Sequence, residues 1–236
     1  MHTERNARPV IVALDVGSEG KALGLVAQLK GLAGMFKVGN ELFMAEGPDV
    51  VRTIVDKGEC VFLDLKLYDI PNTVSKAALE AAALGVSMLT IHASGGPEMI
   101  QSTRKALEDR YGDDRPALVA VTVLTSIDDE TLSRTGVAGT SDDQVRRLAL
   151  MAVEAGADGV VCSAAEIRRL RTDLGLKPTI VTPGVRMPTQ SADDQKRIAT
   201  PRVALDDGAD WLVVGRYVNR AEEPRAALLE VIESMK

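Results

Sequence analysis

Aromatic residues are scarce in this chain of 236 residues, where Phe, Trp and Tyr together make up 3%. Hydrophobic residues nonetheless make up 45%, so the core must consist mainly of Val, Leu, Ile and Ala. Basic residues form no block, and 28 Lys and Arg against 34 Asp and Glu leave a formal net charge of -6. Because nucleic-acid binding needs a basic patch or interleaved aromatic and basic residues, nucleic acid is not expected as a partner.

Cysteine and histidine are equally rare, with two residues of each. Cys60 and Cys162 both lie beside apolar runs, and neither has the spacing of a metal ligand. We expect two buried free thiols rather than a disulfide, because the chain lacks the features of a secreted protein. With only His2 and His92 available as imidazole ligands, a zinc site is not expected and no metal is assigned.

Long apolar segments are also missing. The first residues, M-H-T-E-R-N-A-R-P, are polar and charged, which is not typical of a signal peptide. No run is long and apolar enough to cross a bilayer. The sequence therefore predicts a cytoplasmic protein with no membrane partner.

Short runs rich in β-branched residues recur eight times along the chain. Most are continuously apolar, as expected for parallel strands that are covered on both faces. The predicted strands span residues 10–16, 35–38, 61–65, 88–92, 117–124, 159–162, 179–182 and 211–214.

Segments with helical periodicity separate these strands. Predicted helices run from Pro48 to Gly58, over 72–85, from near Pro97, and over 141–156. Eight strand–helix units predict a (β/α)8 TIM barrel that forms a single α/β domain over residues 1–236. An open doubly wound sheet is the alternative, but no G-x-G-x-x-G motif follows the first strand.

Charged residues gather where the first three strands end. Asp15 lies at the end of the first predicted strand, Lys37 lies on the second, and Asp64 and Lys66 lie on the third. Barrels of this type carry their chemistry at the C-terminal ends of the strands, and a period of two places Asp64 and Lys66 on one face. An alternating array of carboxylates and ammonium groups is therefore expected, and a structural ion-pair network is the alternative. His92 is expected to be a hydrogen-bonded structural residue rather than a catalytic one.

The last two strands give a second signal. They lead into T-P-G-V-R at 182–186 and V-G-R at 214–216, in the loops that commonly bind phosphate in this architecture. Gly215 allows close approach of the backbone, and Arg216 and Arg186 supply cations. Two ordinary turns with surface arginines are the alternative. The pattern indicates a phosphorylated small molecule whose reactive end lies over Lys66.

The segment L-D-L-K-L-Y-D-I-P-N-T at 63–73 resembles the D-x-K-x-x-D-I-P-x-T signature of orotidine 5'-monophosphate decarboxylases. Six further motifs of that family occur in the expected order. They are A-L-D at 13–15, F-K-V-G at 36–39, L-T-S at 124–126, T-P-G-V-R at 182–186, the Gln of D-D-Q at 193–195, and V-G-R at 214–216. The resemblance implies decarboxylation of orotidine 5'-monophosphate to uridine 5'-monophosphate, the last step of de novo pyrimidine synthesis, without metal or organic cofactor.

The resemblance also implies a role for each matching residue. Lys66 would protonate C6 of the pyrimidine, Asp64 would face the substrate carboxylate, and Lys37 and Asp15 would bind the ribose. In a homodimer with shared sites, Asp69 would serve the partner's active site. The remaining substrate-binding residues implied by the resemblance are Ile70 and Thr73 on that partner-facing segment, Thr125 and Ser126 at the pyrimidine, and Pro183, Arg186, Gln195, Gly215 and Arg216 toward the phosphate.

Two rival functions remain open at this point. One is a magnesium-dependent decarboxylase or aldolase of the same barrel superfamily, acting on a keto-sugar phosphate. Such enzymes carry a metal-binding carboxylate on the second strand, where this chain has Lys37. The other is a sensor that binds a phosphorylated ligand without catalysis, although every expected catalytic side chain is present.

Overall fold

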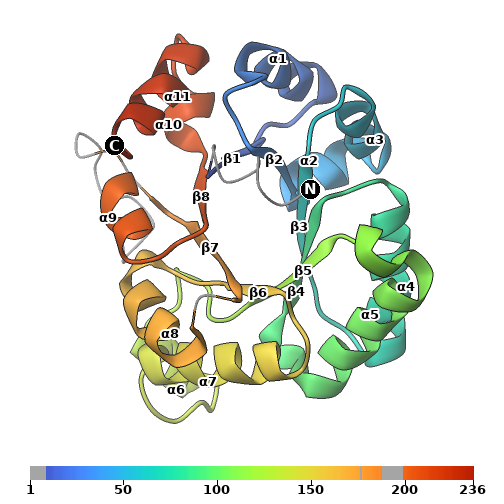
Figure 1. The fold of residues 1–236 in the computed structure, drawn as a ribbon, viewed down its shortest axis with the longest axis vertical. Helices are drawn as coiled ribbons and strands as arrows, with labels where there is room; N and C mark the ends of the chain where they lie inside the picture. The colour runs from blue at the N-terminus through green and yellow to red at the C-terminus, as the bar shows by residue number, and fades with distance from the viewer. Residues whose placement is uncertain (1–8, 176, 186, 188–198) are drawn as a thin grey trace.

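Eight parallel strands close into a barrel in the order β1 to β8 (Figure 1). The computed structural model describes residues 9–175, 177–185, 187 and 199–236. The strands are β1 Val10–Ala13, β2 Met35–Gly39, β3 Val61–Leu67, β4 Met88–His92, β5 Ala117–Val121, β6 Gly159–Val161, β7 Thr179–Pro183 and β8 Trp211–Val214. The predicted (β/α)8 barrel is confirmed, and the closure between β1 and β8 excludes the open sheet.

Helices surround the barrel on its outer side (Figure 1). They are α1 Glu19–Leu29, α2 Asn40–Glu46, α3 Asp49–Asp56, α4 Pro71–Ala83, α5 Gly96–Tyr111, α6 Asp129–Arg134, α7 Ser141–Glu154, α8 Ile167–Leu174, α9 Pro201–Asp206, α10 Arg216–Asn219 and α11 Pro224–Glu233. The four helices predicted from the sequence correspond to α3, α4, α5 and α7, with limits that differ by one or two residues. Three short 3-10 turns, Ala93–Gly95, Gly112–Asp114 and Ala164–Glu166, complete the connections.

Several predicted strands have different ends in the structure. The strand predicted over 10–16 stops at Ala13, and the one predicted over 117–124 stops at Val121. Leu14 and Val123 lie beyond these ends and are nevertheless buried, so apolar character continues past the last paired residue. By contrast, β3 extends to Leu67, because its pairing with β4 resumes there.

Alternating side chains divide the core into two parts. One face of each strand packs against the helices and forms the larger hydrophobic cluster. The other face fills the inside of the barrel, as expected for a barrel of eight strands. The inner cluster consists of Ile11, Ala13, Met35, Phe62, Met88, Val119, Val181, Trp211 and Val213. The inside of the barrel is therefore packed, and open space is left only toward its ends.

Ion pairs at the N-terminal end of the barrel are structural. Asp158, just before β6, accepts hydrogen bonds from Arg115 at 2.6 and 2.7 Å, from Arg104 at 2.7 Å, and from the N–H of Leu118 on β5 at 2.8 Å. Burial raises the pKa of Asp158, but the hydrogen bonds and arginine charges outweigh this effect and hold the pKa below its ordinary value. This carboxylate therefore links the start of β6 to β5 and α5 at the N-terminal end of the barrel.

Both cysteines are free thiols, as expected. Cys162 is buried, but Cys60 is only half-buried, because it precedes β3 at the N-terminal end of the barrel. Within the described residues, no helix combines the length and the apolar character needed to cross a membrane.

Candidate active site

Four charged side chains alternate in sign across the mouth of the barrel. Lys37 Nζ on β2 lies 3.0 Å from Asp15 Oδ1 and 3.7 Å from Asp64 Oδ2. Lys66 Nζ lies 2.9 Å from both carboxylate oxygens of Asp64. The array expected from the sequence is thus present, and Asp64 stands between two ammonium groups. Because Lys37 and Asp64 are 12% and 13% exposed, their attraction is only weakly screened by water.

Gly39 makes room for this array. It lies two residues after Lys37 on β2 and pairs with Asp64 of β3. A Cβ atom at Gly39 would lie 2.8 Å from Lys37 Nζ, which is closer than real Cβ contacts. Glycine at this position therefore lets the lysine side chain fold over the strand and reach both carboxylates.

A bulge in β3 presents the Asp64–Lys66 pair. Leu63 pairs with Leu89 of β4, and Leu67 pairs with Ile91, so three residues of β3 face a single residue of β4. Lys66 has a φ of 53°, and it is the one non-glycine residue with positive φ in the described part of the chain. The prediction that Asp64 and Lys66 lie together is correct. The reason given for it, a regular alternation of side chains along β3, is wrong because the bulge interrupts that alternation. The bulge re-aims the lysine instead.

Thr90 is the residue of β4 that faces the bulge, and sequence reasoning missed it. Its Oγ1 accepts a hydrogen bond from the N–H of Lys66 at 2.8 Å and donates one to Asp64 Oδ1 at 3.1 Å. The available signal was a lone internal polar residue in the apolar strand M-L-T-I-H, next to the strand that carries the charges.

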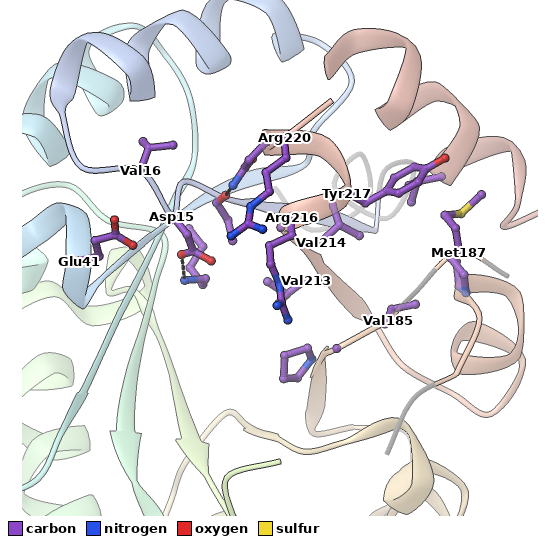
Figure 2. A pocket seen from close by; sticks show the side chains of 18 residues that line it. Asp15, Val16, Glu41, Val185, Met187, Val213, Val214, Arg216, Tyr217 and Arg220 are labelled. Atoms are coloured by element: carbon purple, nitrogen blue, oxygen red, sulfur yellow. Dashed lines mark hydrogen bonds and ion pairs between the residues drawn. The ribbon is translucent and has the colours of Figure 1, made fainter. Parts of the chain in front are cut away.

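Two neighbouring cavities open beside the charged array. The larger has a volume of about 740 Å³ and is lined by Asp15, Lys37, Pro183, Gly215 and Arg216, among others (Figure 2). The smaller has a volume of about 180 Å³ and is lined by Lys37, Asp64, Lys66, Thr125 and Pro183 together with apolar side chains. Because Lys37 and Pro183 line both, the cavities are adjacent and share the array as their boundary.

The larger cavity has cationic and anionic sides. Figure 2 shows Arg216 and Arg220 on one side, and Asp15 and Glu41 on the other. Arg216 begins the short helix α10, and Arg220 directly follows its last residue. Arg220 and Glu41 were not expected from the sequence, since nothing distinguishes them there from other charged residues on helix surfaces. An anionic group would be favoured at the arginine side, and hydroxyl groups at the carboxylate side.

Four predicted site residues line neither cavity in this single chain: Asp69, Ile70, Thr73 and Ser126. Asp69 Oδ1 accepts a hydrogen bond from the N–H of Ile70 at 2.6 Å, and among the described residues no ion pair joins Asp69 to Lys66. Ile70 has the extended backbone expected before Pro71, with φ -60° and ψ 151°.

Two further predicted residues, Arg186 and Gln195, lie outside the described residues. Among those that are described, no group of three or more His, Cys, Asp or Glu side chains gathers where it could hold a metal ion. The two carboxylates of the array are separated by Lys37, which occupies the place between them.

His92 at the end of β4 packs against Tyr68, with ring centroids 5.8 Å apart. The expected hydrogen bond is not observed, since no side-chain hydrogen bond of His92 occurs within the described residues. Burial and the charge of Lys66 lower the pKa of His92 below its ordinary value of 6.5, and Asp64 offsets only part of this effect. The imidazole is therefore neutral at pH 7.

The titration of His92 reports on the charge of Lys66. We expect its pKa, measured by NMR, to lie below 6.5 in the wild type and to rise in Lys66→Ala. The rise follows because the variant loses a cation that disfavours the imidazolium, while Asp64 remains. His2 is the other histidine, and His92→Gln assigns the two signals. An unchanged pKa in Lys66→Ala would mean that Lys66 carries no charge near this ring.

The model of the "Orotidine 5'-phosphate decarboxylase / HUMPS family" matches residues 8–231. The chain belongs to this family. It is 47% identical over 230 residues to an orotidine 5'-phosphate decarboxylase of Pseudoalteromonas translucida, covering 98% of each chain. It is 48% identical over 219 residues to one of Nitrosococcus oceani, covering 93% of this chain and 94% of that relative. Both relatives carry the first of the two names in the family description, and the protein is an enzyme of this decarboxylase group.

The fold agrees with this assignment. A crystal structure of orotidine 5'-phosphate decarboxylase from Lactobacillus acidophilus superposes with a TM-score of 0.86 and 38% identity, covering 97% of this chain and 99% of that one. The family resemblance that seven motifs indicated is thus confirmed over nearly the whole length.

Proposed function

We propose that the protein converts orotidine 5'-monophosphate to uridine 5'-monophosphate and carbon dioxide, with Lys66 as the acid and without metal or organic cofactor. The observation that carries the proposal is the contact of Lys66 Nζ with both oxygens of Asp64, 2.9 Å away, at the edge of a cavity that leads to Arg216. Membership of the decarboxylase family supports the substrate and the overall reaction.

The chemical step needs a cation beside C6. When the C6–carboxylate bond breaks, its electron pair stays on C6, where the ring delocalises it poorly. The Lys66 ammonium stabilises this charge as it develops and then transfers a proton from Nζ to C6, and neutral carbon dioxide leaves. Lys66 regains its proton from solvent. Asp64 orients this ammonium, because both of its carboxylate oxygens accept hydrogen bonds from Lys66 Nζ at 2.9 Å.

Asp64 would also meet the substrate carboxylate. Its side chain lines the small cavity beside Lys66, and Thr125 lies on the same cavity wall. A pyrimidine ring placed there would bring its carboxylate against Asp64, and the like charges would repel each other until carbon dioxide leaves. The neighbouring Lys37 partly offsets this repulsion, since it lies 3.7 Å from Asp64.

Phosphate and ribose would occupy the larger cavity. Arg216 and Gly215 stand on its cationic side, and Asp15 with Lys37 lies between that side and the pyrimidine. Binding energy from the distant phosphate can order the site around the reactive end of the substrate, which raises the rate beyond what the ring contacts achieve. Pro183 contacts both cavities and would contribute to substrate binding. Arg186 and Gln195 are assigned to the same end from the motif alone.

A homodimer with shared active sites is part of the proposal. Asp69 is exposed and lines neither site cavity of its own chain, and its neighbours Tyr68 and Ile70 are 62% and 65% exposed. Exposed apolar side chains around a carboxylate are typical of a contact surface rather than of a solvated loop. Asp69, Ile70 and Thr73 would thus complete the active site of the partner. Ser126, next to Thr125, would face the pyrimidine.

A direct assay tests this function. The absorbance change that accompanies loss of orotidine 5'-monophosphate is recorded with purified protein in the presence of EDTA, and the expected rate equals that without EDTA. Activity that EDTA abolishes and magnesium restores would instead favour the magnesium-dependent rival. Binding of uridine 5'-monophosphate without turnover of orotidine 5'-monophosphate would favour the sensor.

A further inference from the structure

The hydroxyl of Thr90, on the neighbouring strand β4, forms hydrogen bonds with both members of the Asp64–Lys66 pair. It accepts from the backbone N–H of Lys66 and donates to Asp64 Oδ1, so its single proton and one of its two lone pairs are used. Thr90 is 1% exposed and lines neither site cavity. It lines instead a third, mostly apolar cavity between β3 and the outer helices. Any effect of Thr90 on the reaction must therefore pass through Asp64 and Lys66.

The bulge of β3 depends on this side chain. Three residues of β3 stand opposite Thr90 alone, so regular ladder bonding is interrupted at Lys66. Its N–H uses the threonine hydroxyl as its acceptor instead, at 2.8 Å. Lys66 also has the left-handed φ of 53°, which costs free energy for a residue with a side chain and persists only where the surroundings enforce it. The hydroxyl supplies part of that enforcement.

We propose that Thr90 is a positioning residue of the decarboxylation, whose hydroxyl fixes the backbone of Lys66 and the carboxylate of Asp64 in one reactive geometry. The inference rests on the proposed role of Lys66 as the acid. Without the hydroxyl, the N–H of Lys66 loses its acceptor. Asp64 loses one of the hydrogen bonds that fix the orientation of its carboxylate. The ammonium then samples positions away from C6, and small displacements of a catalytic group lower the rate strongly.

Matched substitutions separate positioning from packing. Thr90→Val keeps the shape and removes the hydroxyl, Thr90→Ser keeps the hydroxyl, and Thr90→Ala removes the hydroxyl should the valine variant fail to fold. Thr103→Val is the control, because Thr103 is also fully buried and donates to a backbone carbonyl, that of Met99, within α5. For each variant, kcat, KM, the affinity for uridine 5'-monophosphate and the free energy of unfolding are measured.

We expect Thr90→Val to lower kcat by about 10- to 100-fold while KM and product affinity stay within about threefold. Thr90→Ser should keep kcat within about threefold of the wild type, and Thr103→Val should leave kcat unchanged even if it is destabilised. A wild-type kcat in Thr90→Val, or an equal loss of kcat in Thr90→Ser, would overturn the inference.

Lys66→Ala in the same assay distinguishes a failure of this inference from a failure of the proposed function. Turnover by Lys66→Ala would remove the proposed acid itself. An inactive Lys66→Ala together with a fully active Thr90→Val would leave the acid in place and remove only the positioning role of Thr90.

Discussion

Replacement of Lys66 by alanine is expected to lower kcat by about 10⁴-fold or more, because one side chain supplies both the charge beside C6 and the proton. Affinity for uridine 5'-monophosphate should change far less, since phosphate and ribose are proposed to lie in the larger cavity, which Lys66 does not line. Steady-state kinetics and calorimetric titration with the product separate these two quantities.

Lys105→Ala is a suitable control for this experiment. Lys105 also has an aspartate partner, Asp109, at 2.8 Å, but it lies exposed on α5. Its removal costs at most a weak surface ion pair and should leave kcat unchanged. If Lys66→Ala turned over substrate at a rate near that of Lys105→Ala, Lys66 would not be the acid.

Mixing two inactive variants should restore activity if the sites are shared. In a symmetric dimer of Lys66→Ala and Asp69→Ala chains, one site combines both defects and the other contains intact Lys66 and intact Asp69. With random exchange, half of the dimers are mixed and each has one intact site, so about a quarter of wild-type activity is expected. Each variant alone should be strongly impaired, which makes the restored activity a large effect.

Subunit exchange must be established independently for this test, for example by mass spectrometry of differently tagged chains. The exposed Tyr68 and Ile70 beside Asp69 are the structural reason to expect a contact surface there. Confirmed mixed dimers without restored activity would contradict a shared site and would assign Asp69 to a role within its own chain.

The barrel was predictable from the sequence because its strands are buried on both faces. Continuous apolar runs recur with helical segments between them, and this pattern has few other solutions. Strand ends were less predictable. Leu14 and Val123 are buried although they lie beyond the last residues of β1 and β5, so hydrophobicity alone extends both strands too far.

The charged array was predictable as a set of residues but not in its geometry. Asp15, Lys37, Asp64 and Lys66 were assigned to one end of the barrel, and they meet there. The regular alternation of side chains assumed for β3 cannot reveal the bulge, because the bulge depends on the register between β3 and β4. The contact of Thr90 with Lys66 could not be predicted from the sequence for the same reason. It arises from pairing between strands, and the two residues lie 24 positions apart in the chain.

Ion pairs at the two ends of the barrel differ in their surroundings. Asp158 is enclosed by two arginines and a backbone N–H, with its hydrogen bonds directed at protein groups. Asp64 and Lys66 instead line a cavity. A side chain that borders a cavity can contact a bound ligand, whereas the hydrogen bonds of Asp158 are directed at protein groups. This difference favours a functional array over the purely structural network that the sequence left as an alternative.

Chemical restoration of the ammonium at position 66 tests the central claim most directly. Lys66→Cys is treated with 2-bromoethylamine, which rebuilds a lysine-like side chain with sulfur in place of one methylene. Treated wild-type protein controls for modification of Cys60 and Cys162. We expect kcat to rise at least about 100-fold over the untreated variant. No rise in kcat, with complete modification shown by mass spectrometry and product affinity intact, would contradict the assignment of Lys66 as the acid.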